Sequence, residues 1–228
     1  MTDIEKNLSV VRRRIEEAAA RAGRSPGEVT LVAVSKMHPA GVIREAYAAG
    51  QRHFGENYAQ ELRDKAEELS NLEEIHWHFI GHLQRNKVKY IKKSASLLET
   101  VDSARLAEEL SKQAQGAGRT IGCLVQVNVG EEEQKSGCEP GETAGLLEVV
   151  ERANGLTLEG LMTIPPWDLE AEETRKHFIA LRELRDELGG KARLPHLSMG
   201  MSHDFEEAVE EGATFVRVGT AIFGKRIR

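Results

Sequence analysis

Hydrophobic positions near the start of the chain follow first a helical and then a strand-like spacing. Apolar residues recur every three or four positions, at Ile4, Leu8, Val11 and Ile15. Thr2 and Glu5 match a capping box in front of them, so we expect an amphipathic helix over about the first 20 residues. An apolar run rich in β-branched residues follows at 30–34 and is typical of a strand buried on both faces.

The same alternation continues along the rest of the chain. Further strand-like segments lie at 53–55, 76–80, 97–101, 121–129, 158–162, 196–199 and 215–218. Helix-like segments lie between the strands, at 39–49, 58–69, 84–93, 104–117, 143–153, 170–188 and 204–211. Eight strands that alternate with helices predict parallel strands, right-handed crossovers and closure into a barrel. We therefore expect one α/β domain over residues 1–228, a (β/α)8 TIM-type barrel with an extra N-terminal helix within 1–24 packed on it.

An open doubly wound sheet is the main alternative architecture. Its glycine-rich phosphate signature should follow the first strand, but none follows 30–34. Gly116 and Gly118 stand between a helix and a strand, where they are more simply a helix stop. The barrel is therefore favoured.

Composition limits the classes of function. Of the 228 residues, 40% are hydrophobic and 30% are charged, which is a globular balance, and the net charge of −6 argues against a surface devoted to nucleic acid. The chain has neither a bilayer-spanning apolar stretch nor a secretory signal pattern, so we expect a cytoplasmic protein with no membrane partner. Cys123 and Cys138 are too few for a zinc site or a disulfide framework.

Two loops predict a phosphate site. Barrels of this kind bind ligands at the carboxyl ends of their strands, and they commonly bind phosphate after strands seven and eight. The seventh strand is followed by Gly200 and Ser202, and the eighth by Gly219 and Thr220. Small residues let backbone N–H groups approach an anion, and a short helix starting near Thr220 would point its N-terminus at it. Ordinary loop-to-helix capping also explains either loop alone.

Lys36 stands at the end of the first strand, on the same face as Val32 and Val34. An amine on an apolar face either pairs with a carboxylate or forms an imine with a carbonyl compound. Barrel closure puts the first strand beside the eighth, where phosphate is expected. A ligand with both a phosphate and a carbonyl group would touch both places, and pyridoxal 5′-phosphate (PLP) fits this description.

Several longer segments resemble the pyridoxal phosphate homeostasis protein family (YggS/PROSC). They run through nearly the whole chain, and they are LVAVSK at 31–36, FGENY at 54–58, WHFIGHLQRNK at 77–87, GLM at 160–162, SMGMSHDF at 198–205 and RVGTAIFG at 217–224. The resemblance implies a PLP fold type III barrel, similar to the N-terminal half of alanine racemase. It also implies a protein that carries or buffers PLP and maintains vitamin B6 and amino-acid homeostasis, without robust catalytic activity.

The resemblance further implies which residues bind the cofactor. PLP would form a covalent aldimine on Lys36, and Arg217 would face the pyridine nitrogen. Gly219 and Thr220 would bind the phosphate, and the shell would be completed by Asn57, Ser198 and Ser202. An arginine donates a hydrogen bond to the pyridine nitrogen and leaves it unprotonated, which weakens the electron sink and suits a carrier. No catalytic or metal-binding residue is assigned, PLP-dependent apoenzymes are candidate partners, and a monomer is expected.

An enzyme remains the alternative function. A PLP-dependent amino-acid racemase or related small enzyme would use the same aldimine but would need a second base opposite Lys36. The tyrosines cannot be placed there from sequence, because Tyr47, Tyr58 and Tyr90 all fall in helix-like segments. The carrier is therefore the preferred function.

Two other polar groups stay open. His76 and His78, with His53 and His82 nearby, resemble the start of a barrel metal site, although packed or pocket-lining histidines explain them more simply. The basic run within 84–93 and the loop at 131–137 are candidate docking surfaces for apoenzymes. A solvated helix face explains the basic run more simply. The basic residues of this run are Arg85, Lys87, Lys89, Lys92 and Lys93.

Overall fold

Eight parallel strands close into a barrel in sequence order, with β8 pairing with β1. The computed structural model describes residues 2–130, 136–166 and 169–224. The strands are β1 (Thr30–Val34), β2 (His53–Glu56), β3 (His76–Phe79), β4 (Ala95–Val101), β5 (Ile121–Gln126), β6 (Leu156–Met162), β7 (His196–Ser198) and β8 (Phe215–Val218). The predicted TIM-type barrel is confirmed.

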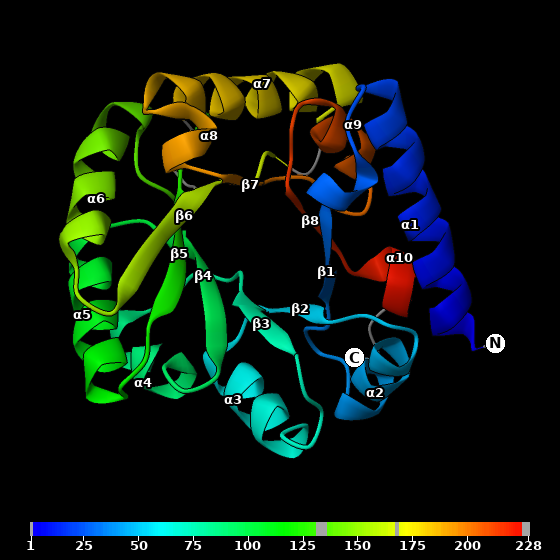
Figure 1. Cartoon of the computed structure of the whole chain (residues 1–228), viewed down its shortest axis with the longest axis horizontal. Helices are drawn as coiled ribbons and strands as arrows, with labels where there is room; N and C mark the ends of the chain where they lie inside the picture. Colours follow the sequence, from blue (N-terminus) through cyan, green and yellow to red (C-terminus); the bar gives the residue numbers. More distant parts are fainter. Residues whose placement is uncertain (1, 131–135, 167–168, 225–228) are drawn as a thin grey trace.

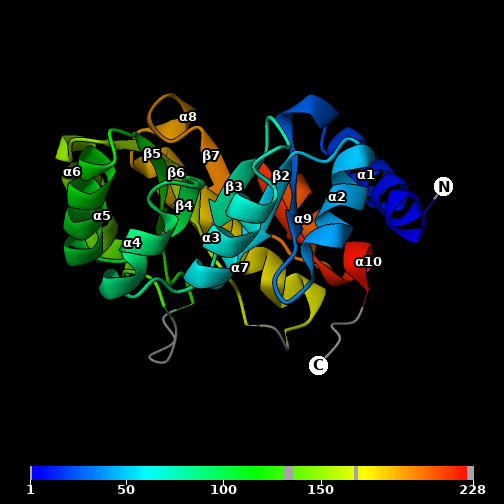
Figure 2. The ribbon, with the colours of Figure 1, turned by 90° about the horizontal axis from the view of Figure 1, so that it is seen from below.

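Helices surround the strands (Figure 1). They are α1 (Asp3–Arg21), α2 (Ala40–Ala48), α3 (Ala59–Glu68), α4 (Val88–Ile91), α5 (Ala104–Gly116), α6 (Pro140–Arg152), α7 (Ala171–Glu187), α8 (Gly190–Arg193), α9 (Phe205–Glu210) and α10 (Thr220–Phe223). Two 3₁₀ turns, η1 (Pro26–Glu28) and η2 (Arg85–Lys87), complete the elements. Figure 2 shows α8, which precedes β7, and α10, which follows β8, at opposite ends of the barrel.

The chain departs from the predicted elements in a few places. Instead of the helix expected over 84–93, the chain forms the 3₁₀ turn η2 followed directly by the single turn of α4, which ends at Ile91. The turn buries Val88 and Ile91, so one apolar face is still covered. The strand expected over 121–129 ends at Gln126, because the next residue, Val127, instead bridges to Cys138.

Alternation along the strands divides the buried residues into two sets. Side chains that point outward pack against the helices and form the large outer core. A smaller apolar cluster fills the barrel interior, with members Val32, Leu97, Leu124, Met162 and Phe215. Polar side chains are also buried within the strands, among them His78, Glu99, Ser198 and Arg217. The interior of the barrel is thus partly polar, and buried polar side chains of this kind need hydrogen-bond partners inside the barrel.

Helix α1 packs against α9, α10 and α2, beside β1 and β8 (Figure 1). Its apolar face buries Leu8, Val11 and Ile15. Asn7 donates from Nδ2 to the carbonyl of Ile222 at 2.9 Å, and this bond ties α1 to α10. The helix therefore supports the loop at the end of β8. In the described part of the chain, none of the helices is both long and apolar enough to span a bilayer.

Candidate functional site

A cavity of about 210 Å³ opens at the carboxyl ends of the strands. Its walls come from the ends of six strands, β1, β2, β3, β6, β7 and β8, or from the loops that follow them. The lining residues are Val34, Lys36, Asn57, Ile80, Ile164, Met201, Ser202, His203, Arg217, Gly219 and Thr220. Six of the seven residues expected around the cofactor are among them; the exception is Ser198.

The segment that carries Lys36 is held on both sides. Lys65 Nζ donates to the carbonyl of Ser35 at 2.7 Å, and Ser35 Oγ donates to Glu56 Oε1 at 2.6 Å. The backbone N–H of Met37 donates to Glu61 Oε1 at 2.6 Å, and Met37 adopts a left-handed φ of 62°. A left-handed backbone conformation costs free energy at a residue other than glycine. The contacts of Ser35 and Met37 therefore stabilise a turn that the segment would not adopt without them.

A buried ion pair forms the base of this arrangement. Lys65 Nζ lies 2.7 Å from Glu56 Oε1 and 2.7 Å from Glu61 Oε1, and the Glu56 side chain is fully buried. Burial raises the pKa of Glu56 to about 7, and the charge and hydrogen bond of Lys65 act in the opposite direction. Lys65 therefore supplies the main compensation for a carboxylate that water does not reach.

The loops after β7 and β8 meet at Ser202. The backbone N–H of Gly219 donates to Ser202 Oγ at 3.3 Å, and Thr220 starts α10 directly afterwards. Gly200 has φ +92°, and a Cβ there would lie 2.6 Å from the Cβ of Ala208. Only glycine fits this approach to α9 without displacement. The two loops thus present hydroxyl groups and early helical N–H groups to the cavity, and such N–H groups have no intrahelical acceptor.

Arg217 enters the cavity from the barrel interior. Its NH1 group donates to Ser198 Oγ at 2.5 Å and its NH2 group to the carbonyl of Thr163 at 2.8 Å. A guanidinium has five N–H groups, so these two bonds leave donors for a ligand. Burial lowers the pKa of Arg217, and the charges of Glu99 and Asp204 oppose that shift. Ser198 itself lies behind Arg217, fully buried, and orients the guanidinium instead of lining the cavity.

Asn57 offers an unused acceptor. Its Oδ1 atom is buried and has no hydrogen-bond partner within the described residues. Gly81 allows the backbone of the next strand end to approach it, since a Cβ on Gly81 would lie 2.2 Å from the carbonyl oxygen of Asn57. A buried, unpaired acceptor beside a cavity is costly unless a ligand donates to it. The residues present therefore fit a polar ligand.

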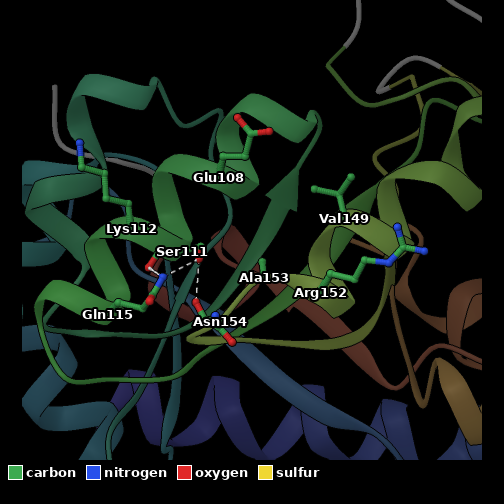
Figure 3. Close-up of a pocket in the computed structure, with 8 residues that line it drawn as sticks. All are labelled: Glu108, Ser111, Lys112, Gln115, Val149, Arg152, Ala153 and Asn154. Atoms are coloured by element: carbon green, nitrogen blue, oxygen red, sulfur yellow. Dashed lines mark hydrogen bonds between the residues drawn. The ribbon is translucent and has the colours of Figure 1, made fainter.

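A larger cavity of about 580 Å³ lies elsewhere, between α5 and α6 (Figure 3). Its lining includes Ser111, whose Oγ donates to the carbonyl of Asn154 at 2.7 Å, and Asn154 precedes β6. It therefore lies toward the amino ends of the strands, where barrel enzymes do not place their chemistry. Volume alone does not identify the site in this protein.

Sequence reasoning missed several residues around the site. The apolar wall formed by Ile80 and Ile164 gave no signal of its own, because strand ends of many barrels carry such residues. Glu99 did leave a signal. It lies two positions after Leu97 in an apolar strand, so period-2 alternation places a carboxylate inside the barrel, where it needs a partner.

The remaining polar groups do not gather at this site. Among residues 2–130, 136–166 and 169–224, no three His, Cys, Asp or Glu side chains are placed to hold a metal ion. His78 instead hydrogen-bonds with His53 and Glu99 inside the barrel. Tyr90 of the basic run contacts the guanidinium of Arg63, at 5.0 Å from the ring centre. Residues 131–135 of the loop expected to dock apoenzymes lie outside the described residues.

Comparison with known proteins agrees with this architecture. The family model described as the alanine racemase N-terminal domain matches residues 6–226. A pyridoxal phosphate homeostasis protein from Aquifex aeolicus is 47% identical over 223 residues, which cover 97% of this chain and 97% of its own length. The protein of the same name from Escherichia coli K12 is 44% identical over 231 residues, covering 99% and 98%.

A solved structure extends the comparison. PipY from Synechococcus elongatus PCC7942, with PLP bound, is 40% identical, has a TM-score of 0.84, and covers 97% of this chain and 100% of its own. Both the matched residues and the identities span nearly the whole chain. The chain therefore belongs to the pyridoxal phosphate homeostasis protein family, and its barrel is an alanine racemase N-terminal domain.

Proposed function

We propose that this protein binds pyridoxal 5′-phosphate in the 210 Å³ cavity and serves as its carrier or buffer in vitamin B6 and amino-acid homeostasis. The observation that carries the proposal is one cavity lined by an amine, a guanidinium and two hydroxyl-bearing loops, which together match the aldehyde, ring nitrogen and phosphate of this cofactor. The PLP-bound structure of PipY and the names of the relatives support it.

Lys36 is the proposed point of covalent attachment. Its Nζ adds to the aldehyde carbon, and the carbonyl oxygen leaves as water when the imine forms. When bound, the cofactor supplies an electron-withdrawing ring in conjugation with that carbon. The contacts of Ser35 and Met37 with Lys65, Glu56 and Glu61 hold the backbone on both sides of Lys36.

Arg217 is the proposed partner of the pyridine nitrogen. Ser198 and Thr163 hold two of its N–H groups, so the guanidinium has a defined orientation. An arginine stays charged and donates, and the ring nitrogen therefore remains an acceptor. This arrangement supports less carbanion stabilisation than an acidic partner would, which favours a carrier over a racemase.

The phosphate is proposed to lie between the loops after β7 and β8. Ser202 Oγ and Thr220 Oγ1 donate to it, with the early backbone N–H groups of α10. Because α10 is a single turn, we assign the binding to hydrogen bonds from these groups. Asn57 Oδ1 accepts from a protonated group of the bound molecule.

A racemase would need a second base, and the cavity offers little for that role. Apart from Lys36 and Arg217, the titratable residue that lines this cavity is His203. Its side chain is about half exposed, and its Nε2 atom lies 3.4 Å from Asp204 Oδ2. Tyr58 is exposed and lines a separate cavity of about 320 Å³. Retention of the α-proton of every amino acid tested in deuterated water would support the carrier.

Covalent attachment at Lys36 tests the proposal. Purified protein with added PLP should show visible absorbance, and borohydride reduction should fix the cofactor at Lys36 in a peptide map. Lys36→Ala should lose this fixation, while the matched control Lys176→Ala, an exposed lysine paired with Glu173, should keep it. Absence of the absorbance from the wild-type protein, or fixation at another lysine, would overturn the assignment.

Substitution in the phosphate loops should weaken binding of PLP more than binding of pyridoxal. Ser202→Ala and Thr220→Val each remove one charge-assisted hydrogen bond, so the Kd for PLP should rise about tenfold or more. The Kd for pyridoxal, which has no phosphate, should stay within about twofold of the wild-type value. Equilibrium titration followed by absorbance measures both. An equal rise of the Kd for PLP and for pyridoxal would show that the phosphate binds elsewhere.

A further inference from the structure

A buried carboxylate lies behind Arg217, inside the barrel. Arg217 NH1 donates to Ser198 Oγ, and Ser198 Oγ donates to Glu99 Oε2, both at 2.5 Å. The hydroxyl thus stands between the two charged groups, and Glu99 Oε2 lies 3.9 Å from Arg217 NH1. Glu99 and Ser198 are fully buried. The proposed binding of the cofactor does not use Glu99, although a carboxylate that water does not reach is costly to bury.

The chemistry of the three groups determines the direction of both bonds. A guanidinium has only donors and a carboxylate only acceptors, so the hydroxyl must accept from Arg217 and give its one proton to Glu99. Glu99 is ionised in this arrangement. Burial raises the pKa of Glu99, but the hydrogen bond and charge of His78 and the charge of Arg217 outweigh it, so that the pKa lies below its usual value. As long as Glu99 accepts this proton, the lone pairs of Ser198 Oγ face the guanidinium.

Glu99 is held by a second partner on its other oxygen. Its Oε1 atom lies 2.6 Å from His78 Nδ1, and the His78 side chain is buried as well. Because an ionised carboxylate can only accept, the Nδ1 atom of His78 carries the proton and donates it. The two oxygens of Glu99 therefore have separate partners, one on β3 and one on β7. The carboxylate cannot rotate without breaking one of these bonds.

The other terminal nitrogen of the guanidinium is held at the end of β6. Arg217 NH2 donates to the carbonyl of Thr163 at 2.8 Å, and the backbone N–H of Thr163 donates to the carbonyl of Ser198 at 3.1 Å. The two anchors of the guanidinium are thus tied to each other. Arg217 still lines the cofactor cavity, so its remaining N–H groups are available to a ligand.

A hydroxyl between the two charges leaves more of the guanidinium for the ligand than a direct ion pair would. A carboxylate that pairs bidentately with an arginine occupies two N–H groups and turns the flat edge of the guanidinium toward itself. Through Ser198, Glu99 occupies a single N–H group of Arg217, and its charge still compensates the buried cation. The arrangement therefore keeps the cation buried and its free donors at the cavity.

We propose that Glu99 is a positioning residue that acts through Ser198: it fixes the Arg217 guanidinium toward the ring nitrogen of the ligand and thereby sets the preference of the cavity for nitrogen over carbon at that position. The inference rests on the proposed function, because it assumes that Arg217 faces the pyridine nitrogen. A Glu99 that only balanced the buried charge would instead change stability, and its loss would weaken ligands with and without a ring nitrogen alike.

The test compares binding of PLP with binding of its 1-deaza analogue, in which a C–H group replaces the ring nitrogen. The discrimination ratio is the Kd of the analogue divided by the Kd of PLP. The double variant Arg217→Met with Glu99→Gln leaves no unpaired charge and gives the baseline ratio without the arginine. Because the analogue leaves a buried donor unpaired, the wild-type ratio should exceed this baseline about tenfold or more. Intrinsic differences between the two aldehydes are common to all variants and cancel.

Loss of the hydroxyl bridge should remove the preference. Ser198→Ala keeps both charges but lets the guanidinium turn toward Glu99, and Glu99→Met removes the acceptor of the hydroxyl proton. Each should bring the discrimination ratio to within about twofold of the baseline. The variant with both changes should lose no more than either alone, because the two residues act through one series of bonds. Since Ser198→Ala retains the ion pair, it tests the inference even where circular dichroism shows that Glu99→Met does not fold.

Two glutamine variants separate the hydrogen bond from the charge. The amide oxygen of Glu99→Gln accepts the same bond from Ser198, so its discrimination ratio should stay within about twofold of wild type. Glu159→Gln changes a half-buried carboxylate on β6 that is not part of the series, and it should leave the ratio unchanged. A ratio at the baseline in Glu99→Gln would refute positioning through the hydroxyl.

A readout without cofactor comes from proton NMR of the unliganded protein. A hydroxyl proton in a short bond to a buried carboxylate is strongly deshielded, so Ser198 should give a downfield signal that Ser198→Ala removes and thereby identifies. In Glu99→Met this signal should move upfield, because the carboxylate that accepts the proton is gone. A signal at the same position in Glu99→Met would contradict the bond on which the inference depends.

The binding measurements distinguish failure of the inference from failure of the proposed function. Absence of PLP binding by the wild-type protein would overturn the proposed function. A wild-type ratio equal to the baseline would show that Arg217 does not meet the ring nitrogen, and it would overturn that assignment together with the inference. A wild-type ratio that exceeds the baseline and persists in Ser198→Ala would overturn the inference alone.

Discussion

Replacement of Lys65 by methionine should lower the free energy of unfolding by about 3–5 kcal/mol. Lys65 Nζ donates to Glu56 Oε1, Glu61 Oε1 and the carbonyl of Ser35, each at 2.7 Å, and methionine can replace none of these bonds. The Glu56 side chain is buried, so water cannot replace the lost ion pair, and the carboxylate would keep only the hydrogen bond from Ser35. Urea unfolding followed by circular dichroism measures the change.

The pH dependence of stability provides a second sign of this defect. Because burial raises the pKa of Glu56 above its unfolded value, the folded state binds more protons than the unfolded state between about pH 4.5 and 7. Stability contributed by the protonated group is present at the acid end of this window and is lost as the pH rises through about 7. Lys65→Met should therefore recover stability on acidification, and the double variant Lys65→Met with Glu56→Gln should recover it at neutral pH.

A surface ion pair is the matched control for Lys65. Lys176→Met removes a pair with Glu173 in which both side chains are more than half exposed, so it should change stability by less than about 1 kcal/mol. Lys65→Met should also slow imine formation at Lys36, because the carbonyl of Ser35 loses its anchor. Equal stabilities of Lys65→Met and Lys176→Met would show that the buried pair does not stabilise the turn.

Gly160→Ala should destabilise the barrel by about 3–5 kcal/mol. Gly160 pairs with His196 across β6 and β7, and a Cβ at Gly160 would lie only 1.9 Å from the carbonyl oxygen of His196. Its φ of +153° is also one that side-chain-bearing residues rarely adopt. Backbone atoms of β7 would have to move, and they cannot turn aside as a flexible side chain can. Denaturant unfolding of wild type and variant measures the loss.

Gly145→Ala separates this steric effect from the general effect of replacing glycine. Gly145 lies on an exposed face of α6, and a Cβ there would meet no atom within 4 Å. Alanine favours a helix interior, so this variant should be more stable than wild type by up to about 1 kcal/mol. If Gly160→Ala proved as stable as Gly145→Ala, the close approach of β6 and β7 would not be a constraint in solution.

Local patterns were sufficient for the elements of the barrel. The runs at 30–34 and 215–218 are strands with the same bounds in the structure, because turn residues mark the ends of each apolar run. The expected helix at 84–93 failed as a single element, although its apolar positions were identified correctly. Helical spacing reports which face is buried, but apolar positions three residues apart fit a 3₁₀ turn as well as an α-helix.

The candidate site shows the same division. The sequence placed Lys36 at the end of one strand and Gly219 and Thr220 at the end of another, and the fold brings all three to one cavity. It also placed Ser198 at this cavity, but the side chain lies behind Arg217. Period-2 alternation gives the face of a residue in a strand but not its depth along the barrel axis, which depends on the register of neighbouring strands.

The sequence by itself determined the closed barrel, the lysine just after its first strand, and the small, hydroxyl-bearing loops after its last two strands. Each of these follows from residue spacing within a short segment. Only the tertiary structure decided that Glu99, Ser198 and Arg217, from β4, β7 and β8, meet in one hydrogen-bonded series. Barrel closure brings together strands that are far apart in the chain, and a contact between single polar residues in such strands leaves no periodic pattern from which it can be predicted.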